Sequence, residues 1–517
     1  MKPAFKFTII ALVFGAILAG GWYLKTSGAL DKLTEKVAPE GRQAESILDK
    51  KTAESVKAGD IPLVTVCIVQ WGGYAGGQYF NGGFKASTDS RYYKEYGMLV
   101  EFLQIEEFTT SRNTWKAGKC QVIWITADSF VTEAGSLPDN PKVFFQADWS
   151  RGGDAIVVKH DINAVRDLKG KKVAVALGTP SHTFLLMMLR ADELEYKDVQ
   201  IVGVDSAPTA ALNFKNGVVD AALVWSPDDE DCVRSVPGAK VLKSTKEATN
   251  IIADVFFAKA AWLDNNPKLA KGLVEGWLRG AAEINSSASA KEEAIKILMA
   301  GLNIDRELAT NAINNVRLAT YGDNVNFFNL KGNYQGVTGE NLYTKMGGLF
   351  TKVNFISGGF PGWRQVINTS VLNSITLGDT GANAAETAPT FEKAREADKV
   401  APAFSSKALT VTFPSGSSVL DENARVIIDL GFADVVRAFA GARVRIEGHT
   451  DSVGGREANV RLSQARAQAV ADYLVSKYQF DSNRFVVVGY GPDKPVADNQ
   501  TAEGKAKNRR TEFQLLN

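Results

Sequence analysis

Short apolar runs alternate with amphipathic helical stretches between residues 61 and 376. Apolar runs of this length predict strands, and the longer stretches with helical spacing predict helices. The alternation predicts an α/β domain with a mostly parallel sheet, here divided into two lobes. The predicted strands cover residues 63–70, 99–103, 121–125, 155–158, 172–176, 199–204 and 221–224.

A second pattern lies near the C-terminus. Residues 444–447 predict a strand, and apolar residues recur at helical spacing over 456–478. On this helix Asn459, Leu462 and Arg466 are three and four residues apart, so they share one face. Asp451 follows the strand and lies near the start of the helix. The pattern therefore gathers a carboxylate, an amide and a guanidinium at one place.

The C-terminal region resembles OmpA-like peptidoglycan-binding domains. The residues that carry the resemblance are Gly448-His449-Thr450-Asp451, Asn459, Leu462-Ser463, Arg466-Ala467, Gly489-Tyr490-Gly491, Pro495, Asn499 and Asn508-Arg509-Arg510. The resemblance implies an α+β domain, an envelope location and the diaminopimelate stem peptide of peptidoglycan as partner. It implies that Asp451 accepts from the diaminopimelate ammonium and that Arg466 forks onto its carboxylate, which Lys could not do. The remaining pocket residues that it implies are Thr450, Asn459, Leu462 and Arg509.

The alternative interpretation of this region is an ordinary surface ion pair on a helix. A catalytic triad of His449 with Asp451 and Ser463 is rejected, because His449 belongs to the motif and no nucleophile elbow is present. Pro414 and Lys505 depart from the residues common in the family. Both are expected to lie away from the binding site.

Residues 7–24 form an uncharged apolar run that follows two lysines. A helix of this length just spans a hydrocarbon core, and Trp22 and Tyr23 suit its outer edge. We expect an uncleaved N-terminal transmembrane helix, with a signal peptide cut after the small residues Ala19 and Gly21 as the alternative. Both interpretations place most of the chain outside the cytoplasm.

Charge and cysteine content exclude several functions. Lys and Arg number 59 against 58 Asp and Glu, which gives no support for nucleic-acid binding. Three cysteines, Cys67, Cys120 and Cys232, leave at least one unpaired. The three histidines are far apart in sequence and no Cys/His cluster occurs, so we predict no metal site and no cofactor. We also predict no catalytic residues.

The expected organisation has five parts. Residues 1–25 are the anchor or signal, 26–60 a polar spacer, and 61–376 the two-lobed domain. Residues 377–406, rich in Ala, Thr, Glu and Pro, are expected to form a flexible linker that cannot fold alone. Residues 407–517 form the peptidoglycan-binding domain.

Residues 167–228 resemble the second lobe of periplasmic solute-binding proteins of ABC importers, of the nitrate, sulfonate and taurine type. The resemblance rests on the ordered pieces DLKGKKVAV, Gly-Thr…Ser-His, Asn216-Gly217-Val218-Val219-Asp220, and Trp225 with Pro227. It implies a type II binding-protein fold whose second lobe covers about residues 152–255. The chain would cross near residues 150–153 and return near 254–257.

The strand ends of this domain predict a solute site, because ligands of open α/β sheets bind at the carboxyl ends of strands. Glycines after the first strand would let backbone amides approach a ligand, and a helix N-terminus after residue 178 suits an anion. Helix capping and core packing remain the alternatives for the hydroxyls and tryptophans. The candidates are Trp71, Gly72, Gly73, Tyr74, Thr126, Asp128, Gly178, Thr179, Ser181, His182 and Trp225.

Together these patterns predict a non-catalytic protein of the Gram-negative periplasm, anchored in the inner membrane and attached to the cell wall. Its middle domain would bind or sense a small solute, anionic in one interpretation, with an ABC permease or an envelope sensor as a further partner. The alternative is a structural tether between inner membrane and wall whose middle domain binds no solute or binds a protein.

Overall fold

The computed structural model describes residues 61–411, 413–414 and 416–516. The predicted anchor and spacer lie outside these residues. Within the described part of the chain, no helix combines the length and apolar character needed to cross a membrane.

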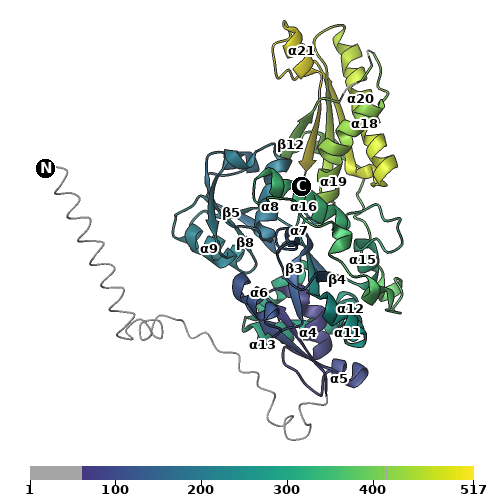
Figure 1. The fold of residues 1–517 in the computed structure, drawn as a ribbon. Coiled ribbons are helices and arrows are strands. Elements are labelled where there is room, and N and C mark those ends of the chain that lie inside the picture. Colours follow the sequence, from purple (N-terminus) through teal and green to yellow (C-terminus); the bar gives the residue numbers. More distant parts are fainter. Residues whose placement is uncertain (1–60, 412, 415, 517) are drawn as a thin grey trace, which may run out of the picture. The chain divides into compact units, whose positions relative to one another are not determined.

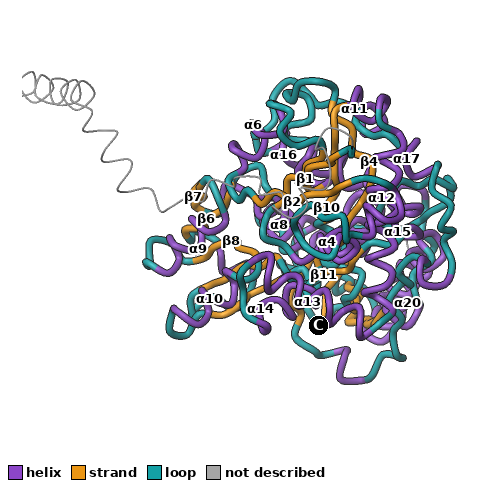
Figure 2. Tube along the Cα trace, turned by 90° about the horizontal axis from the view of Figure 1, so that it is seen from below, coloured by secondary structure: helices purple, strands orange, loops and turns teal. Residues whose placement is uncertain are grey.

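The middle domain contains two separate sheets (Figures 1 and 2). Within the described residues the first has six strands in the order β11-β4-β10-β3-β1-β2 and the second has five in the order β7-β6-β8-β5-β9. The strands of the first sheet are β1 (Leu63–Ile68), β2 (Leu99–Gln104), β3 (Val122–Thr126), β4 (Pro141–Ser150), β10 (Ala253–Lys259) and β11 (Val316–Leu318). Those of the second are β5 (Asp154–Val158), β6 (Lys172–Ala176), β7 (Gln200–Val204), β8 (Ala221–Trp225) and β9 (Lys240–Ser244).

Both sheets are mixed, so the prediction of mostly parallel sheets is wrong. β1 pairs in parallel with β2 and β3, whereas β10 is antiparallel to β3 and β4. In the second sheet β6 is parallel to β7 and β8, whereas β5 is antiparallel to β8 and β9. The reversal arises where the chain passes between lobes, from β4 directly into β5 and later back into β10.

Helices cover both sheets, and their apolar faces form the core with the strands. α12 packs on α4, and the buried Trp277 of α12 contacts the rings of Phe256 and Phe145 from the sheet. The helices of the middle domain are α4 (Ala75–Asn81), α5 (Arg91–Tyr96), α6 (Phe108–Lys116), α7 (Ala127–Phe130), α8 (Pro180–Ala191), α9 (Ala207–Lys215), α10 (Asp228–Ser235), α11 (Ala260–Asn265), α12 (Pro267–Ser286), α13 (Ala288–Leu302), α14 (Arg306–Asn314), α15 (Tyr321–Phe327), α16 (Gly339–Lys352) and α17 (Ser370–Asn373).

The C-terminal domain is a four-stranded sheet, within the residues described, with helices against it. The strand order is β12-β15-β13-β14, and α20 packs across β13 and β14. Gly448 and Gly489 let α20 approach, since a Cβ at either position would lie 2.2–2.4 Å from α20 backbone. The elements are β12 (Ala403–Leu409), α18 (Glu422–Ile428), α19 (Asp434–Ala438), β13 (Arg443–His449), α20 (Arg456–Tyr478), β14 (Phe485–Gly491), α21 (Ala502–Asn508) and β15 (Thr511–Leu516).

The segment between the two domains makes hydrogen bonds with both of them. Its last residues belong to β12, and the Glu386 amide donates to Asp323 Oδ1 at 2.6 Å. β12 also contacts the middle domain, where the Ser405 hydroxyl donates to the Ala191 carbonyl at 2.6 Å. The segment also contacts the C-terminal domain, where the Phe391 amide donates to Asp481 Oδ2 at 2.8 Å, while the flexibility of the segment stays a prediction.

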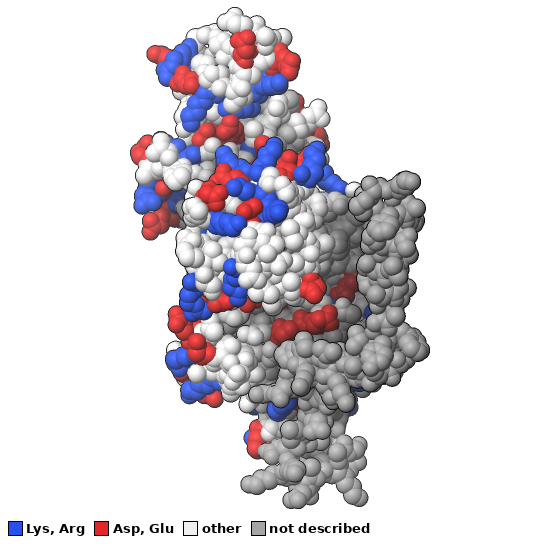
Figure 3. Space-filling view, turned by 90° about the vertical axis from the view of Figure 1, so that its left-hand side faces the viewer, with Lys and Arg blue, Asp and Glu red and all other residues white. Residues whose placement is uncertain are grey.

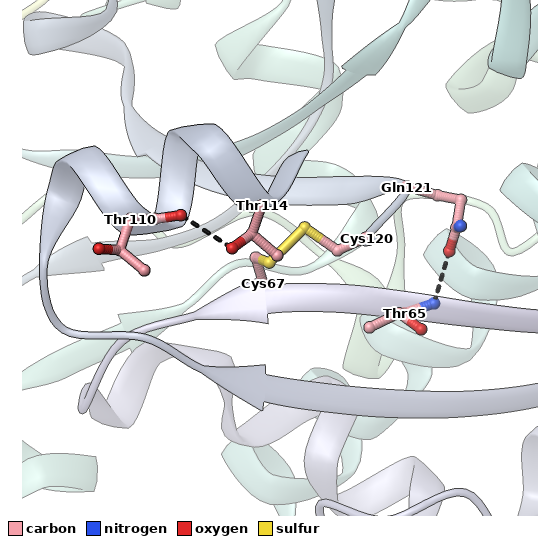
Figure 4. Close-up of a disulfide and its surroundings, with 6 residues drawn as sticks. All are labelled: Thr65, Cys67, Thr110, Thr114, Cys120 and Gln121. Carbon is pink, nitrogen blue, oxygen red and sulfur yellow. Dashed lines mark hydrogen bonds between the residues drawn. A yellow bond between two sulfur atoms is a disulfide. The ribbon is translucent and has the colours of Figure 1, made fainter. Parts of the chain in front are cut away.

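A disulfide joins Cys67 of β1 to Cys120, just before β3 (Figure 4). It closes a loop with a sequence separation of 53 residues across two neighbouring parallel strands. Cys232 is free and buried, which confirms that one cysteine is unpaired.

Acidic and basic side chains are interspersed on the face of the molecule shown in Figure 3. This agrees with the formal net charge of +1.

Candidate functional site

The C-terminal domain carries a pocket of about 680 Å³ between the β13 exit, α20 and α21. Helical spacing on α20 and the turn after β13 bring the predicted residues together, as their positions along the chain require. All six predicted peptidoglycan-binding residues line it: Thr450, Asp451, Asn459, Leu462, Arg466 and Arg509.

Asp451 is held in place by two groups at the pocket. Its Oδ2 pairs with Arg509 Nη1 at 2.7 Å, and its Oδ1 accepts from the Val453 amide at 3.0 Å. The side-chain amide of Asn459 donates to the Val453 carbonyl at 2.9 Å and fixes the same turn. Arg509 is therefore a direct partner of Asp451 and more than a lining residue.

Arg466 donates to carbonyl oxygens of the loop after β12. Its Nε lies 2.9 Å from Ser417 O and its Nη2 lies 3.4 Å from Pro414 O, while Phe413 lies under the guanidinium at 5.0 Å. Burial, followed by the positive charge of Arg509, lowers the pKa of Arg466. Arg466, Arg509 and Arg510 thus bring three guanidinium groups to the pocket, beside the single carboxylate of Asp451.

The expectation that Pro414 and Lys505 lie away from the site is wrong. The Pro414 carbonyl contacts Arg466, and Lys505 lines the pocket. The sequence patterns did not indicate these two contacts. Pro414 contacts Arg466 through its backbone carbonyl, which any residue type would supply, and Lys505 reaches the pocket because α21 lies beside it.

Glu447, His449 and Glu512 gather behind this pocket, with one ligand-type atom of each within 4.8 Å of the others. Arg445 lies 2.8 Å from Glu447, and Arg510 lies 2.6 Å from Glu512. Ion pairs with these two arginines account for the two carboxylates without a metal. The prediction that the protein has no metal site stays a prediction.

The candidate solute site lies where the two lobes meet. A cavity of about 20 Å³ is lined from the first lobe by Trp71, Tyr74 and Asp254, and from the second by Asp154 and Trp225. Of the predicted residues, Trp71, Tyr74 and Trp225 thus come together. Thr126 lies directly opposite Asp254 in the β3–β10 ladder, so its side chain points to the same face of the sheet.

Two hydrogen bonds tie the aromatic side chains of this site to carboxylates. Trp71 Nε1 donates to Asp148 Oδ2 at 3.1 Å, and the Tyr74 hydroxyl donates to Asp254 Oδ2 at 2.7 Å. Trp71 also contacts the crossing segment, since a Cβ on Gly153 would lie 2.2 Å from its ring.

The glycines after β1 serve protein packing in this structure. A Cβ on Gly73 would lie 1.7 Å from Asp148 Oδ2, and one on Gly72 would lie 2.2 Å from the Ala312 carbonyl. We expected these glycines to let a ligand come close to their backbone amides. In this structure other parts of the chain occupy that space instead.

The start of α8 is arranged differently from a simple cap. Thr179 is the N-cap residue, but its hydroxyl donates to the Ala176 carbonyl at 2.7 Å, and the buried Ser181 Oγ has no partner among the described residues. The Gly178 amide donates to His182 Nδ1 at 3.2 Å. The His182 ring lies among Tyr196, Phe350 and Phe355, where burial lowers its pKa to about 4. His182 is thus part of the packing around α8.

Three acidic residues of the cleft escaped the sequence analysis: Asp148, Asp154 and Asp254. With the predicted Asp128, they form a set of carboxyl groups that are at most 4% exposed. Burial raises the pKa of Asp128 and Asp154 to about 7 and that of Asp148 to about 8, and raises the pKa of Asp254 well above its ordinary value. These three residues could have been recognised in the sequence, because each is an acidic residue within or beside an apolar run.

Comparisons with known proteins divide the chain in the same way. Residues 412–509 match the model of the OmpA family, and residues 82–287 match the model described as NMT1/THI5 like. Outer membrane porin F of Pseudomonas aeruginosa is 44% identical over 107 residues, which are 21% of this chain and 30% of that protein. Peptidoglycan-binding protein ArfA of Mycobacterium bovis is 46% identical over 81 residues, 16% of this chain and 24% of that protein.

The chain spans less than a third of the length of these two relatives. Among solved structures, the periplasmic aliphatic sulphonate binding protein SsuA from Escherichia coli matches with 17% identity and a TM-score of 0.47, over 60% of this chain and 99% of that one. The resemblances inferred from the sequence are confirmed for two segments: the chain carries an OmpA-family region at its C-terminus and an NMT1/THI5-like region before it.

Proposed function

We propose that this chain binds peptidoglycan through the pocket of its C-terminal domain and presents a solute-binding middle domain in the cell envelope. The observation that carries the first part is the convergence of Asp451, Arg466 and Arg509 on one open pocket. The name of the relative ArfA, a peptidoglycan-binding protein, supports the same assignment.

The pocket geometry suggests how diaminopimelate is held. The Pro414 and Ser417 carbonyls occupy acceptor positions on Arg466, and the ligand carboxylate would take their place with a stronger, charge-assisted pair of bonds. Asp451, oriented by Arg509, would accept from the ligand ammonium. Each half of the zwitterion then has a partner of opposite charge.

Co-sedimentation of the full-length protein with purified diaminopimelate-type peptidoglycan tests this proposal. Asp451→Ala and Arg466→Ala should each abolish sedimentation, because an unpaired ligand charge in a pocket costs about 2–5 kcal/mol. Arg461→Ala is the matched control, since Arg461 lies exposed on α20 and, within the part of the chain that the structure describes, its ion pair is with Glu457. Sedimentation of both pocket variants at the wild-type level would refute the proposal.

For the middle domain, the carboxyl groups of the interlobe cavity favour a ligand site over a non-binding lobe. Buried carboxyl groups destabilise a fold unless they are paired, so a purely structural lobe has no use for them. The small cavity, about 20 Å³, favours the alternative of a tether that binds no solute. Identification of a small molecule released from the purified full-length protein would decide for solute binding.

Attachment to the inner membrane completes the proposal. It rests on the apolar run of residues 7–24, outside the described residues. N-terminal sequencing of the native protein tests it, since a start near Trp22 would show that the segment is removed. The absence of catalysis, and a permease or sensor as partner, stay predictions.

A further inference from the structure

The strongest unassigned feature is the set of buried carboxylates between the lobes. Asp148 and Asp254 are direct cross-strand neighbours on β4 and β10, so their side chains point to the same face of the first sheet. Asp254 lines the cavity, and Asp154 lines it from the second lobe, opposite Trp225 in the β5–β8 ladder. Carboxylates therefore face the cavity from both lobes.

Among the described residues, one of these carboxylate oxygens lacks a protein partner. Oδ1 of Asp148 is buried without a hydrogen bond, whereas the hydroxyls of Thr126 and Thr183 are donors beside Asp128. Both residues are fully buried. Buried acceptors without donors are rare in folded proteins and indicate a group that satisfies them in another state of the protein.

The rest of the wall is half aromatic, with Val69, Gln70, Pro180 and Ile252 as its other residues. Trp71, Tyr74, Trp124 and Trp225 line the same cavity. Aromatic faces attract cations through their quadrupole, and carboxylates attract them by charge, so the two kinds of wall select the same ligand. An anion would meet repulsion from each carboxylate of the set that is ionised.

From this arrangement we infer that the solute of the middle domain is an organic cation, an alkylammonium or a diamine, held between Asp254 on one lobe and Asp154 on the other, with Asp148 adding its charge from the position next to Asp254. This inference rests on the proposed solute-binding function and names its ligand class. It replaces the anionic solute considered from the sequence. The negative charge of the carboxylates affects a charged ligand more strongly than the partial positive charge at the N-terminus of α8.

A metal ion fits the site less well. A metal needs three or more donor atoms close together, and among the described residues only Glu447, His449 and Glu512 reach that spacing. The cleft carboxylates are spread across two strands and two lobes, which suits a ligand with several atoms. The remaining alternative is that these carboxyl groups are protonated and bind no ligand. In that case the protein should not respond to cations.

The test is thermal unfolding of the full-length protein at pH 8, followed by tryptophan fluorescence. The probes are butylammonium, tetramethylammonium and butane-1,4-diammonium chlorides, with sodium ethanesulfonate, sodium chloride, magnesium chloride and zinc chloride for comparison. We expect at least one ammonium probe to raise the unfolding temperature in a saturable way, beyond the effect of sodium chloride. Asp148→Asn and Asp154→Asn should weaken that binding at least about 30-fold, the lower end of the effect of removing one partner of a buried charge pair.

Asp264→Asn is the matched control, because Asp264 is exposed on α11 and should leave binding unchanged. If Asp148→Asn does not fold, Asp154→Asn carries the test from the other lobe. Stabilisation by ethanesulfonate or by a metal chloride alone, or by no probe, would overturn the inference. A neutral or anionic molecule released from the purified protein would overturn it while leaving solute binding intact, whereas no released molecule and no binding probe would refute both.

Discussion

Breaking the Cys67–Cys120 disulfide should destabilise the middle domain and leave the peptidoglycan-binding domain almost unchanged. The bond closes a loop with a separation of 53 residues, and both sulfurs are buried beside paired strands. Loop-closure entropy for a loop of this length gives about 4 kcal/mol of stabilisation at 25 °C. Removal of the bond should therefore erase much of the 5–15 kcal/mol typical of a folded domain.

Urea unfolding with and without reductant, followed by tryptophan fluorescence, measures this effect. Eight of the nine tryptophans lie in residues 61–376, the ninth is Trp22, and none lies in residues 407–517, so the signal reports mainly on the middle domain. Cys67→Ala/Cys120→Ala should unfold at the lower urea concentration of the reduced wild type and should not respond to reductant. Cys232→Ala is the control, because Cys232 is already free and its response to reductant should equal that of wild type.

A shift of less than about 1 kcal/mol on reduction would refute the loop-entropy reasoning. It would mean that the unfolded chain keeps β1 and β3 together without the bond. The same experiment bears on the compartment, since a domain that depends on a disulfide folds properly only where disulfides persist.

Three further predictions follow from individual contacts. Arg466→Lys should lower co-sedimentation with peptidoglycan nearly as much as alanine, because an ammonium cannot form the paired bonds of a guanidinium; retention of wild-type binding would show that charge alone suffices. Gly73→Ala should destabilise the middle domain by about 1–3 kcal/mol in urea unfolding, since its Cβ would lie 1.7 Å from Asp148 Oδ2. A Cβ at Gly348 in α16 would meet no described residue within 4 Å, so Gly348→Ala should be neutral or stabilising. Without ligand, the middle domain should lose stability from pH 6.5 to 8.5, because the raised pKa values of Asp148 and Asp154 mean that the folded chain binds protons the unfolded chain has released. Asp148→Asn should flatten that slope, and an unchanged slope would show that Asp148 does not titrate there. His182 acts in the opposite sense mainly below pH 7, and Lys345, whose pKa burial lowers to about 8, acts in the opposite sense at the upper end of the range, so the slope is compared between wild type and variant.

The sequence predicted those elements whose hydrophobic pattern is uninterrupted. The strand of residues 172–176 and the helix of residues 456–478 have the bounds of β6 and α20. The peptidoglycan pocket was also within reach of the sequence, because its residues lie on one helix face and beside it, where spacing determines position.

The solute cleft was only partly predictable, because its key residues break the pattern from which strands are inferred. β4 runs Pro141–Ser150 and is almost wholly buried, yet it contains Gln146 and Asp148, which interrupt its apolar run. The pairing of β4 with β10, which brings Asp148 beside Asp254, joins residues about a hundred positions apart. A local pattern carries no information on such a pairing, and functional residues are expected where sequence and burial disagree.

On the proposed cation site, the same carboxylates would also control the closure of the lobes. Asp154 belongs to the second lobe and Asp148 and Asp254 to the first, so a closing movement would bring ionised carboxylates together in a region of low dielectric constant. Without a cation, the repulsion between them, or the free-energy cost of protonating them, would oppose the closed form. A cation between them reverses the sign of the interaction, and it can shift the lobes only by its differential affinity for the closed form. A protein held at the cell wall by its C-terminal domain would then register the solute as a change in lobe closure, without having to leave the wall to deliver it.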